Sequence, residues 1–193
     1  MCTKMVKREK DSKEGVEVDV DIPEGASVEI GENSITAKGE KGELSKTLRI
    51  GKIKVSKKDS KIVLSSGSNR RKDLSLLGTL RGDIKNVVHG VCDGIEYKLK
   101  IVYSHFPMSI KVQGNKVMIE NFLGEKHPRK ADILEGVNVE VKGQDVTVSG
   151  IDKENVAQTA ANMEQATKIK NLDPRVFQDG CYIIEKDGKH LKR

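Results

Sequence analysis

Apolar and polar residues alternate along much of the chain in short stretches that are typical of half-buried strands. Val16, Val18, Val20 and Ile22 alternate with acidic residues, so one face of a strand would be apolar and the other charged. Gly, Asn and Ser residues between such stretches favour tight turns. The pattern predicts antiparallel strands in this half at 16–22, 28–30, 35–37, 44–50, 53–55 and 62–64.

The apolar period lengthens to three and four residues between Leu74 and Val91. This spacing places the apolar side chains on one face and predicts a long amphipathic helix. Ser68 or Asn69 is expected to cap its start, and glycines 90 and 94 bracket its end. Alternation returns directly afterwards and predicts a strand at 95–101.

The second half of the chain repeats this order of elements. Strands are expected at 110–112, 117–119, 137–141 and 146–148, followed by a helix capped by Asp152 and a last strand at 182–184. Matching positions in the two halves differ by a constant number of residues, since 110 − 28 and 124 − 42 both equal 82. The matched positions are Val28, Ile30, Asn33, Ile35 and Gly42 with Ile110, Val112, Asn115, Val117 and Gly124. Unrelated hairpins could also look alike, but the shared order favours duplication.

The repeat predicts an α+β fold of two tandem similar domains, each an antiparallel sheet packed against one main helix. The boundaries we expect are a basic arm at 1–14, a first domain at 15–104, a second domain at 105–186 and a basic tail at 187–193. The hinge would lie near 104–107. Two small domains also agree with an apolar fraction of 36%, which is low for one dense core.

Charge favours a polyanionic partner. The formal net charge is +6, and a surplus of Lys and Arg promotes binding to nucleic acid through counterion release. A charged coat on a soluble protein would give the same composition. No apolar stretch is long enough to span a bilayer, and no signal peptide is evident, so we expect no membrane association and a reducing compartment, either the cytosol or the nucleus.

The residues offer little for catalysis. The three cysteines are scattered without CxxC spacing, and the four histidines have no HxH or HExxH neighbours, so we expect no metal and no disulfide framework. Nucleotide-binding and nucleophile motifs are also missing. We therefore expect no enzyme activity, no cofactor and no small-molecule substrate. An enzyme with a site assembled only by folding stays open, as does a protein–protein adaptor.

Two basic stretches are candidate nucleic-acid contacts. The first is the segment 121–130, in which Gly124 permits a turn and Pro128 restricts the loop. Its candidate phosphate ligands are Lys126, His127, Arg129 and Lys130. An ordinary basic hairpin loop would have the same composition.

The second stretch runs from Lys168 to Tyr182. Lys168 and Lys170 could serve only to offset a helix dipole, but that explanation does not cover Arg175. We expect Phe177, Asp179, Gly180 and Tyr182 to hold the connector in shape while the cations are displayed. With aromatic residues at 3%, recognition of RNA shape and backbone is favoured over base stacking.

The same stretch resembles the large-subunit ribosomal protein family L-six, in its archaeal and eukaryotic branch, where eukaryotes call it L-nine. Segments 102–107 and 121–126 resemble the join between the family's domains and its second-domain loop. Two positions depart from the C-terminal motif, Leu172 in place of a basic residue and Cys181. The positions that match it are Gln165, Ile169, Arg175, Phe177, Asp179, Gly180, Tyr182, Ile183 and Lys186.

The resemblance implies a structural role in the large ribosomal subunit, without catalysis. It implies binding of ribosomal RNA near the sarcin–ricin loop and the stalk base, beside neighbouring ribosomal proteins and the site of translational GTPases. By position it adds Lys186 to the expected RNA contacts and supports Lys170, Arg175 and the loop 126–130. It also implies a cytoplasmic ribosome, with nucleolar assembly if the source is eukaryotic.

Overall fold

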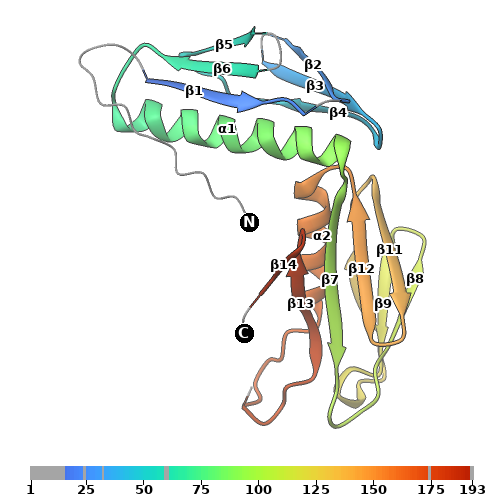
Figure 1. The fold of residues 1–193 in the computed structure, drawn as a ribbon. Helices are drawn as coiled ribbons and strands as arrows, with labels where there is room; N and C mark the ends of the chain where they lie inside the picture. Colours follow the sequence, from blue (N-terminus) through green and yellow to red (C-terminus); the bar gives the residue numbers. More distant parts are fainter. Residues whose placement is uncertain (1–15, 24, 32, 59–60, 174, 192–193) are drawn as a thin grey trace.

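The first domain packs one long helix against antiparallel strands. A computed structural model describes residues 16–23, 25–31, 33–58, 61–173 and 175–191. The strands of the first domain form two three-stranded sheets, ordered β1-β6-β5 and β2-β3-β4, and α1 covers them on one side (Figure 1). The elements are β1 (Val16–Asp21), β2 (Ser27–Ile30), β3 (Ser34–Gly39), β4 (Gly42–Thr47), β5 (Ile53–Lys58), β6 (Lys61–Ser66) and α1 (Arg71–Cys92).

The apolar face of α1 forms much of the first core. Leu77, Leu80, Ile84 and Val91 are buried against the strands, as the three- and four-residue spacing predicts. The expected cap is wrong, because Arg70 occupies the N-cap position and makes no side-chain cap bond. The Ser68 hydroxyl instead accepts a hydrogen bond from the Arg70 amide at 3.3 Å, ahead of the helix.

The second domain packs a shorter helix against a five-stranded sheet ordered β11-β12-β7-β13-β14 and a three-stranded sheet ordered β10-β9-β8. Asp152 caps the helix as expected, accepting a hydrogen bond from the Glu154 amide at 3.0 Å. The elements are β7 (Ile95–Val102), β8 (Ser109–Gln113), β9 (Lys116–Glu120), a 3-10 turn η1 (Phe122–Gly124), β10 (Arg129–Asp132), β11 (Val137–Lys142), β12 (Asp145–Gly150), α2 (Lys153–Ala166), β13 (Gly180–Lys186) and β14 (Lys189–His190).

The domain boundary lies before β7. This strand pairs with β12 and β13, with Tyr97 opposite Val148 and Leu99 opposite Ile183. The prediction that residues 95–104 close the first domain is therefore wrong, and 104–107 is the β7–β8 loop, not the hinge. Alternation in β7 correctly indicated one buried face, but alternation does not identify the partner strands.

The predicted tandem similar domains are confirmed, with a different starting point for the repeat. The order β1-β6-β5 corresponds to β7-β12-β11, and the sheet β2-β3-β4 corresponds to β8-β9-β10. The second repeat thus begins with β7, the strand that was expected to end the first repeat. The second domain adds β13 and β14, so residues 189–190 belong to a hairpin and not to an extended tail.

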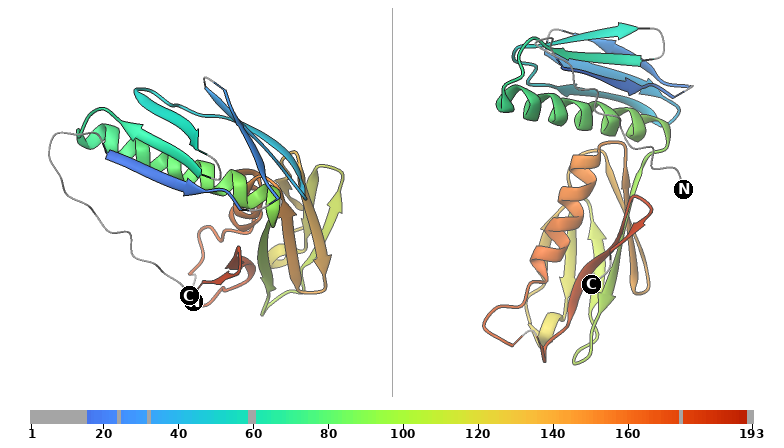
Figure 2. Two further views of the ribbon diagram at one scale, coloured as in Figure 1. Left: turned by 45° about the horizontal axis from the view of Figure 1, so that its top comes forward. Right: turned by 60° about the vertical axis from the view of Figure 1, so that its left-hand side comes forward.

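The two domains meet where the end of α1 approaches the start of α2 (Figure 2). The amide of Lys41 donates to the carbonyl of Val91 at 3.0 Å, beside the joint. Across the joint, the Lys153 ammonium donates to the Asn86 side chain at 3.2 Å. The Ile151 side chain, from the loop before α2, packs against the core of the first domain. Hydrogen bonds and apolar contacts therefore both connect the domains.

Two ion-pair systems strengthen this joint. Lys46 pairs with Asp83 at 3.6 Å within the first domain and with Glu154 in the second. The His89 ring lies between Asp93, at 2.7 Å from Nδ1, and Asp187 of the second domain, at 3.2 Å from Nε2. His89 is therefore partly buried, and both of its ring nitrogens have a carboxylate partner.

Candidate nucleic-acid interface

The connector, residues 167–179, leaves α2 and returns at β13. Thr167 fixes its base: the hydroxyl of Thr167 donates to the carbonyl of Glu164 at 3.1 Å and accepts from the amide of Cys181 at 2.9 Å. Thr167 is buried, so water does not compete for these bonds. The end of the helix and the start of the strand are thereby held together at the base of the loop.

Asp179 fixes the other end of the connector. Its carboxylate is fully buried and accepts hydrogen bonds from the Ser104 amide at 2.6 Å, the Ser104 hydroxyl at 2.9 Å and the His105 amide at 3.4 Å. Burial alone would raise the pKa of this carboxyl, but the bonds from Ser104 and His105 outweigh burial and hold the pKa below its ordinary value. The sequence placed Asp179 among the residues that shape the connector, but it did not identify Ser104 and His105 as its partners.

The aromatic residues support the same segment. The Phe177 ring stacks on His105 with centroids 4.8 Å apart, and the Tyr182 hydroxyl donates to the Gln178 carbonyl at 3.2 Å. A Cβ on Gly180 would lie 3.2 Å from the Tyr182 ring, closer than ordinary packing. Phe177, Asp179 and Tyr182 thus each make a contact within the connector or between it and the loop after β7, and Gly180 leaves room for the Tyr182 ring.

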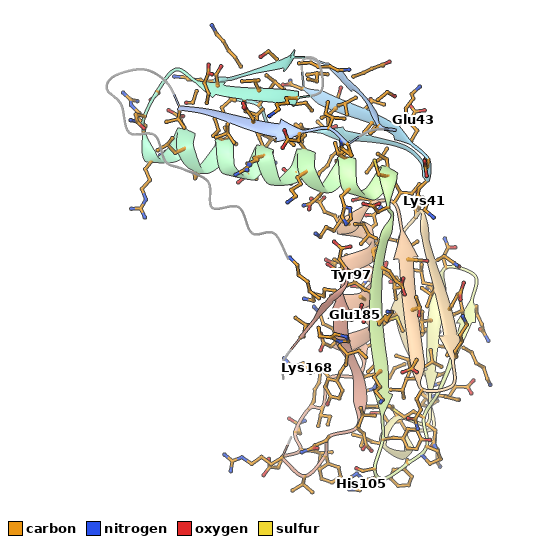
Figure 3. The ribbon with its side chains drawn as sticks, in the orientation of Figure 1. Lys41, Glu43, Tyr97, His105, Lys168 and Glu185 are labelled. Atoms are coloured by element: carbon orange, nitrogen blue, oxygen red, sulfur yellow. The ribbon has the colours of Figure 1, made fainter. Side chains whose placement is uncertain are left out.

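The connector displays three cations. Lys168, Lys170 and Arg175 are exposed, and their side chains make no ion pair with any residue that the structure describes. Figure 3 shows Lys168 projecting from the second domain on the side of β13 and β14. Because these charges are not neutralised within the described chain, they remain available to an external anion.

Arg129 differs from its basic neighbours, because most of its donors are used internally. Its guanidinium pairs with both carboxylate oxygens of Glu125, at 2.8 and 2.6 Å, and donates to the carbonyls of Ala166 at 2.9 Å and Lys168 at 3.2 Å. It also lies 4.2 Å above the Phe122 ring. The side chain therefore acts as a clamp between the segment 125–129 and the end of α2.

The Arg129 clamp brings the two predicted basic stretches together. Lys126 and His127 are exposed in the loop after η1, and Lys130 is exposed on β10. The expectation of a loop through residue 130 is thus corrected, since Arg129 and Lys130 pair with Ile119 and Met118. Alternating orientation on β10 places Lys130 outward, next to the inward-turned Arg129.

Lys186 is separate from this group. It ends β13 and pairs with Lys189 of β14, while the connector precedes the opposite end of the same strand. Lys186 lies six positions along the strand from Gly180, which is about 20 Å. The expected contacts therefore form one cluster at the connector and one isolated exposed lysine near the domain joint.

Within the described ranges, no group of three His, Cys, Asp or Glu side chains could hold a metal ion, and no helix is both long and apolar enough to cross a membrane. A hollow at the joint is lined by His89, Asp93, Glu96, Glu185 and Asp187 among others. Both ring nitrogens of His89 already face carboxylates, so this histidine serves as a tie between domains.

Comparison with known proteins finds one matching family model and several similar proteins. The family model "Ribosomal protein L6" matches residues 22–94 and 106–180, one segment in each domain. The "Large ribosomal subunit protein uL6" of Methanobrevibacter smithii is 48% identical over 169 residues, covering 88% of this chain and 95% of that protein. Proteins of the same name from Methanothrix thermoacetophila and Methanosarcina mazei are each 48% identical over 167 residues, covering 86% of this chain and 95% of theirs.

The matches cover both domains and nearly the full length of each relative. The resemblance expected from the C-terminal motif is therefore confirmed, and with it the assignment to ribosomal structural proteins and not to enzymes. This chain therefore belongs to the ribosomal protein L6 family.

Proposed function

We propose that this protein is a structural component of the large ribosomal subunit in the cytoplasm. We also propose that it binds ribosomal RNA through Lys168, Lys170 and Arg175, which we call the connector cluster. The observation that carries the proposal is a loop tied at both ends whose cations have no ion-pair partner among the residues that the structure describes. Thr167 and Asp179 fix its two ends, while Lys168, Lys170 and Arg175 stay exposed. A loop held in one shape loses little conformational entropy when it binds, so its charges can serve recognition.

Lys126, His127 and Lys130 extend the proposed contact surface, because Arg129 holds their segment against the end of α2. We assign Arg129 itself mainly to this clamp, with one guanidinium hydrogen left for a phosphate. Lys186 is a further proposed contact, reaching RNA at a different point. Lys and Arg contacts to phosphates would dominate the affinity and make it fall steeply with salt.

The finer placement follows the resemblance. We propose that the connector cluster lies near the sarcin–ricin loop and the stalk base of the subunit, next to other ribosomal proteins, where it supports the docking of translational GTPases. No chemistry is required of the protein in this role. Its contribution is a fixed arrangement of cations that stabilises one RNA conformation.

Sedimentation of the tagged protein from cell lysate through a sucrose gradient tests the subunit assignment. We expect the protein to comigrate with large subunits and with full ribosomes at both low and high salt. Recovery at the top of the gradient at every salt would reject the proposal, and comigration only at low salt would reduce it to nonspecific binding of RNA.

A pair of charge-reversal variants tests the connector cluster. We expect the double variant Lys170→Glu, Arg175→Glu to be lost from the large-subunit fraction of the gradient. Its circular dichroism should stay that of the wild type, because both side chains are exposed. The matched control reverses Arg49 and Lys54, an exposed arginine and lysine of the first domain. Equal retention of both variants would reject the cluster, and loss of folding in the first would reject its surface placement.

A further inference from the structure

One side of α1 faces away from both sheets and is exposed from residue 71 to residue 85. Residues 71, 75, 78, 82 and 85 are all exposed and follow one another at intervals of four, three, four and three. In an α-helix this spacing gives one straight line of about 21 Å. We call it the open face of α1. Figure 1 shows the helix lying between its sheets and the open angle formed by the two domains.

The open face and its edges carry cations without partners. These side chains make no ion pair or side-chain hydrogen bond within the part of the chain that the structure describes. Asp83, one of two acidic residues in the helix, is occupied by Lys46 at 3.6 Å. The α1 cations are Arg71, Lys72, Arg81 and Lys85.

Two glycines on the open face have no role inside the described structure. A Cβ added to Gly78 or Gly82 would find nothing within 4 Å. Gly90 of the same helix is different, since its Cβ would lie 2.1 Å from the Ile151 carbonyl oxygen at the domain joint. Glycine weakens a helix interior, so an open glycine has a cost without an internal gain. What it offers is a smooth helix surface that an outside molecule can approach closely.

The chemistry of the open face fits a phosphate backbone better than a protein surface. None of the exposed large hydrophobic residues among the described positions belongs to α1. Protein interfaces are enriched in aromatic and apolar anchors at their centre, whereas nucleic-acid interfaces are polar and positively charged. Cations around a line of small residues match a polyanion that lies along the helix.

We propose that the open face of α1 is a second RNA-binding surface, where Arg71, Lys72, Arg81 and Lys85 contact phosphates and Gly78 and Gly82 let the RNA backbone lie against the helix. This inference rests on the proposed function and extends it to the first domain. The ties at the joint, His89 to Asp187 and Lys153 to Asn86, hold this surface at a fixed angle to the connector cluster. One RNA could then engage both surfaces at once.

Matched charge variants test the proposal. Arg71→Gln, Lys72→Gln and Lys85→Gln together remove three α1 cations, and Arg49→Gln, Lys52→Gln and Lys54→Gln remove the same residue types elsewhere on the first domain. Filter binding to deproteinised large-subunit ribosomal RNA of Methanobrevibacter smithii is measured from low to high salt. We expect only the first triple variant to flatten the slope of log K against log salt, by about 2 to 3.

The glycines give a test with opposite signs. Gly78→Gln with Gly82→Gln should raise the melting temperature, because glutamine favours helix and meets open space. The same variant should bind the RNA more weakly, because its side chains hold the backbone away from the helix. Unchanged binding together with the expected stabilisation would contradict close approach, and a lowered melting temperature would contradict the open glycine sites.

The outcomes separate the two proposals. If the wild-type protein fails to bind the RNA and does not sediment with subunits, the proposed function fails and this inference fails with it. If the wild type binds and the two triple variants bind equally, only the second surface is rejected. A benzophenone amino acid at Ser75, activated in purified large subunits, should crosslink to RNA, and crosslinking to a ribosomal protein would overturn the assignment.

Discussion

The buried carboxylate of Asp179 accepts a hydrogen bond from the Ser104 amide at 2.6 Å, although 75 residues of chain separate the two. The contact joins the end of the connector to the loop after β7. A basic segment with free ends would lose more conformational freedom on binding RNA than this one, whose two ends are already tied. The connector cluster is therefore a property of the whole second domain and not of the residues that carry its charges.

Replacing Asp179 by Asn should destabilise the protein by about 1–3 kcal/mol at neutral pH, because a buried carboxylate acceptor is lost and an amide donor faces other donors. Urea unfolding followed by circular dichroism measures the change. Asp145→Asn is the control, since Asp145 is exposed and makes no ion pair with a described residue. Equal stability of the two variants would contradict the structural role of Asp179.

The stability difference between the wild type and Asp179→Asn should depend on pH. The pKa of Asp179 is lowered in the folded protein, so its contribution to the free energy of unfolding is full above the unfolded pKa of about 3.9. That contribution is lost as pH falls through the folded pKa. The stability difference between wild type and Asp179→Asn should be constant from about pH 5 to 8 and shrink below about pH 4. A difference that grows toward acid pH would have the wrong sign.

Arg129→Lys should destabilise the second domain by about 1–3 kcal/mol, because an ammonium cannot replace the bonds to Glu125, Ala166 and Lys168 together. Urea unfolding measures the loss, and hydrogen exchange should locate it at β10 and the end of α2. Glu125→Gln, which leaves the two carbonyl contacts intact, should cost less. A smaller effect of Arg129→Lys than of Glu125→Gln would argue that the carbonyl contacts contribute little.

Two glycines of α1 should respond oppositely to alanine. Gly78→Ala should raise the free energy of unfolding by about 1 kcal/mol, because its Cβ meets open space in a helix interior. Gly90→Ala should lower it by about 1–3 kcal/mol, because its Cβ would overlap the Ile151 carbonyl oxygen and separate the domains. Denaturant unfolding of both variants decides the matter, and effects of the same sign would contradict the packing of the joint.

The two described cysteines should react with thiol reagents at very different rates. Burial raises the pKa of Cys181 to about 12, and burial, followed by Asp93, also raises that of half-buried Cys92. In a Cys2→Ser background at pH 8, mass spectrometry should find slow labelling of Cys92. Cys181 should be labelled only after unfolding. Native labelling of Cys181 would mean that the base of the connector opens.

The sequence by itself predicted elements whose signal is local. Three- and four-residue spacing predicted α1, because its buried face depends only on positions within the helix. Asp152 was predicted as a cap because a cap acts on the neighbouring backbone. The repeat and the resemblance likewise predicted two similar α+β domains and the family, both of which are confirmed.

Only the tertiary structure decided which strands pair across the domain boundary and which charges are free. Alternation in β7 is equally compatible with either sheet, and pairing with β12 and β13 assigned it to the second. Arg129 and Lys130 look alike in sequence, yet one turns inward to Glu125 and the other stays exposed. The physical reason is the same for both: strand pairing and charge neutralisation depend on residues distant in sequence, which meet only in the folded chain.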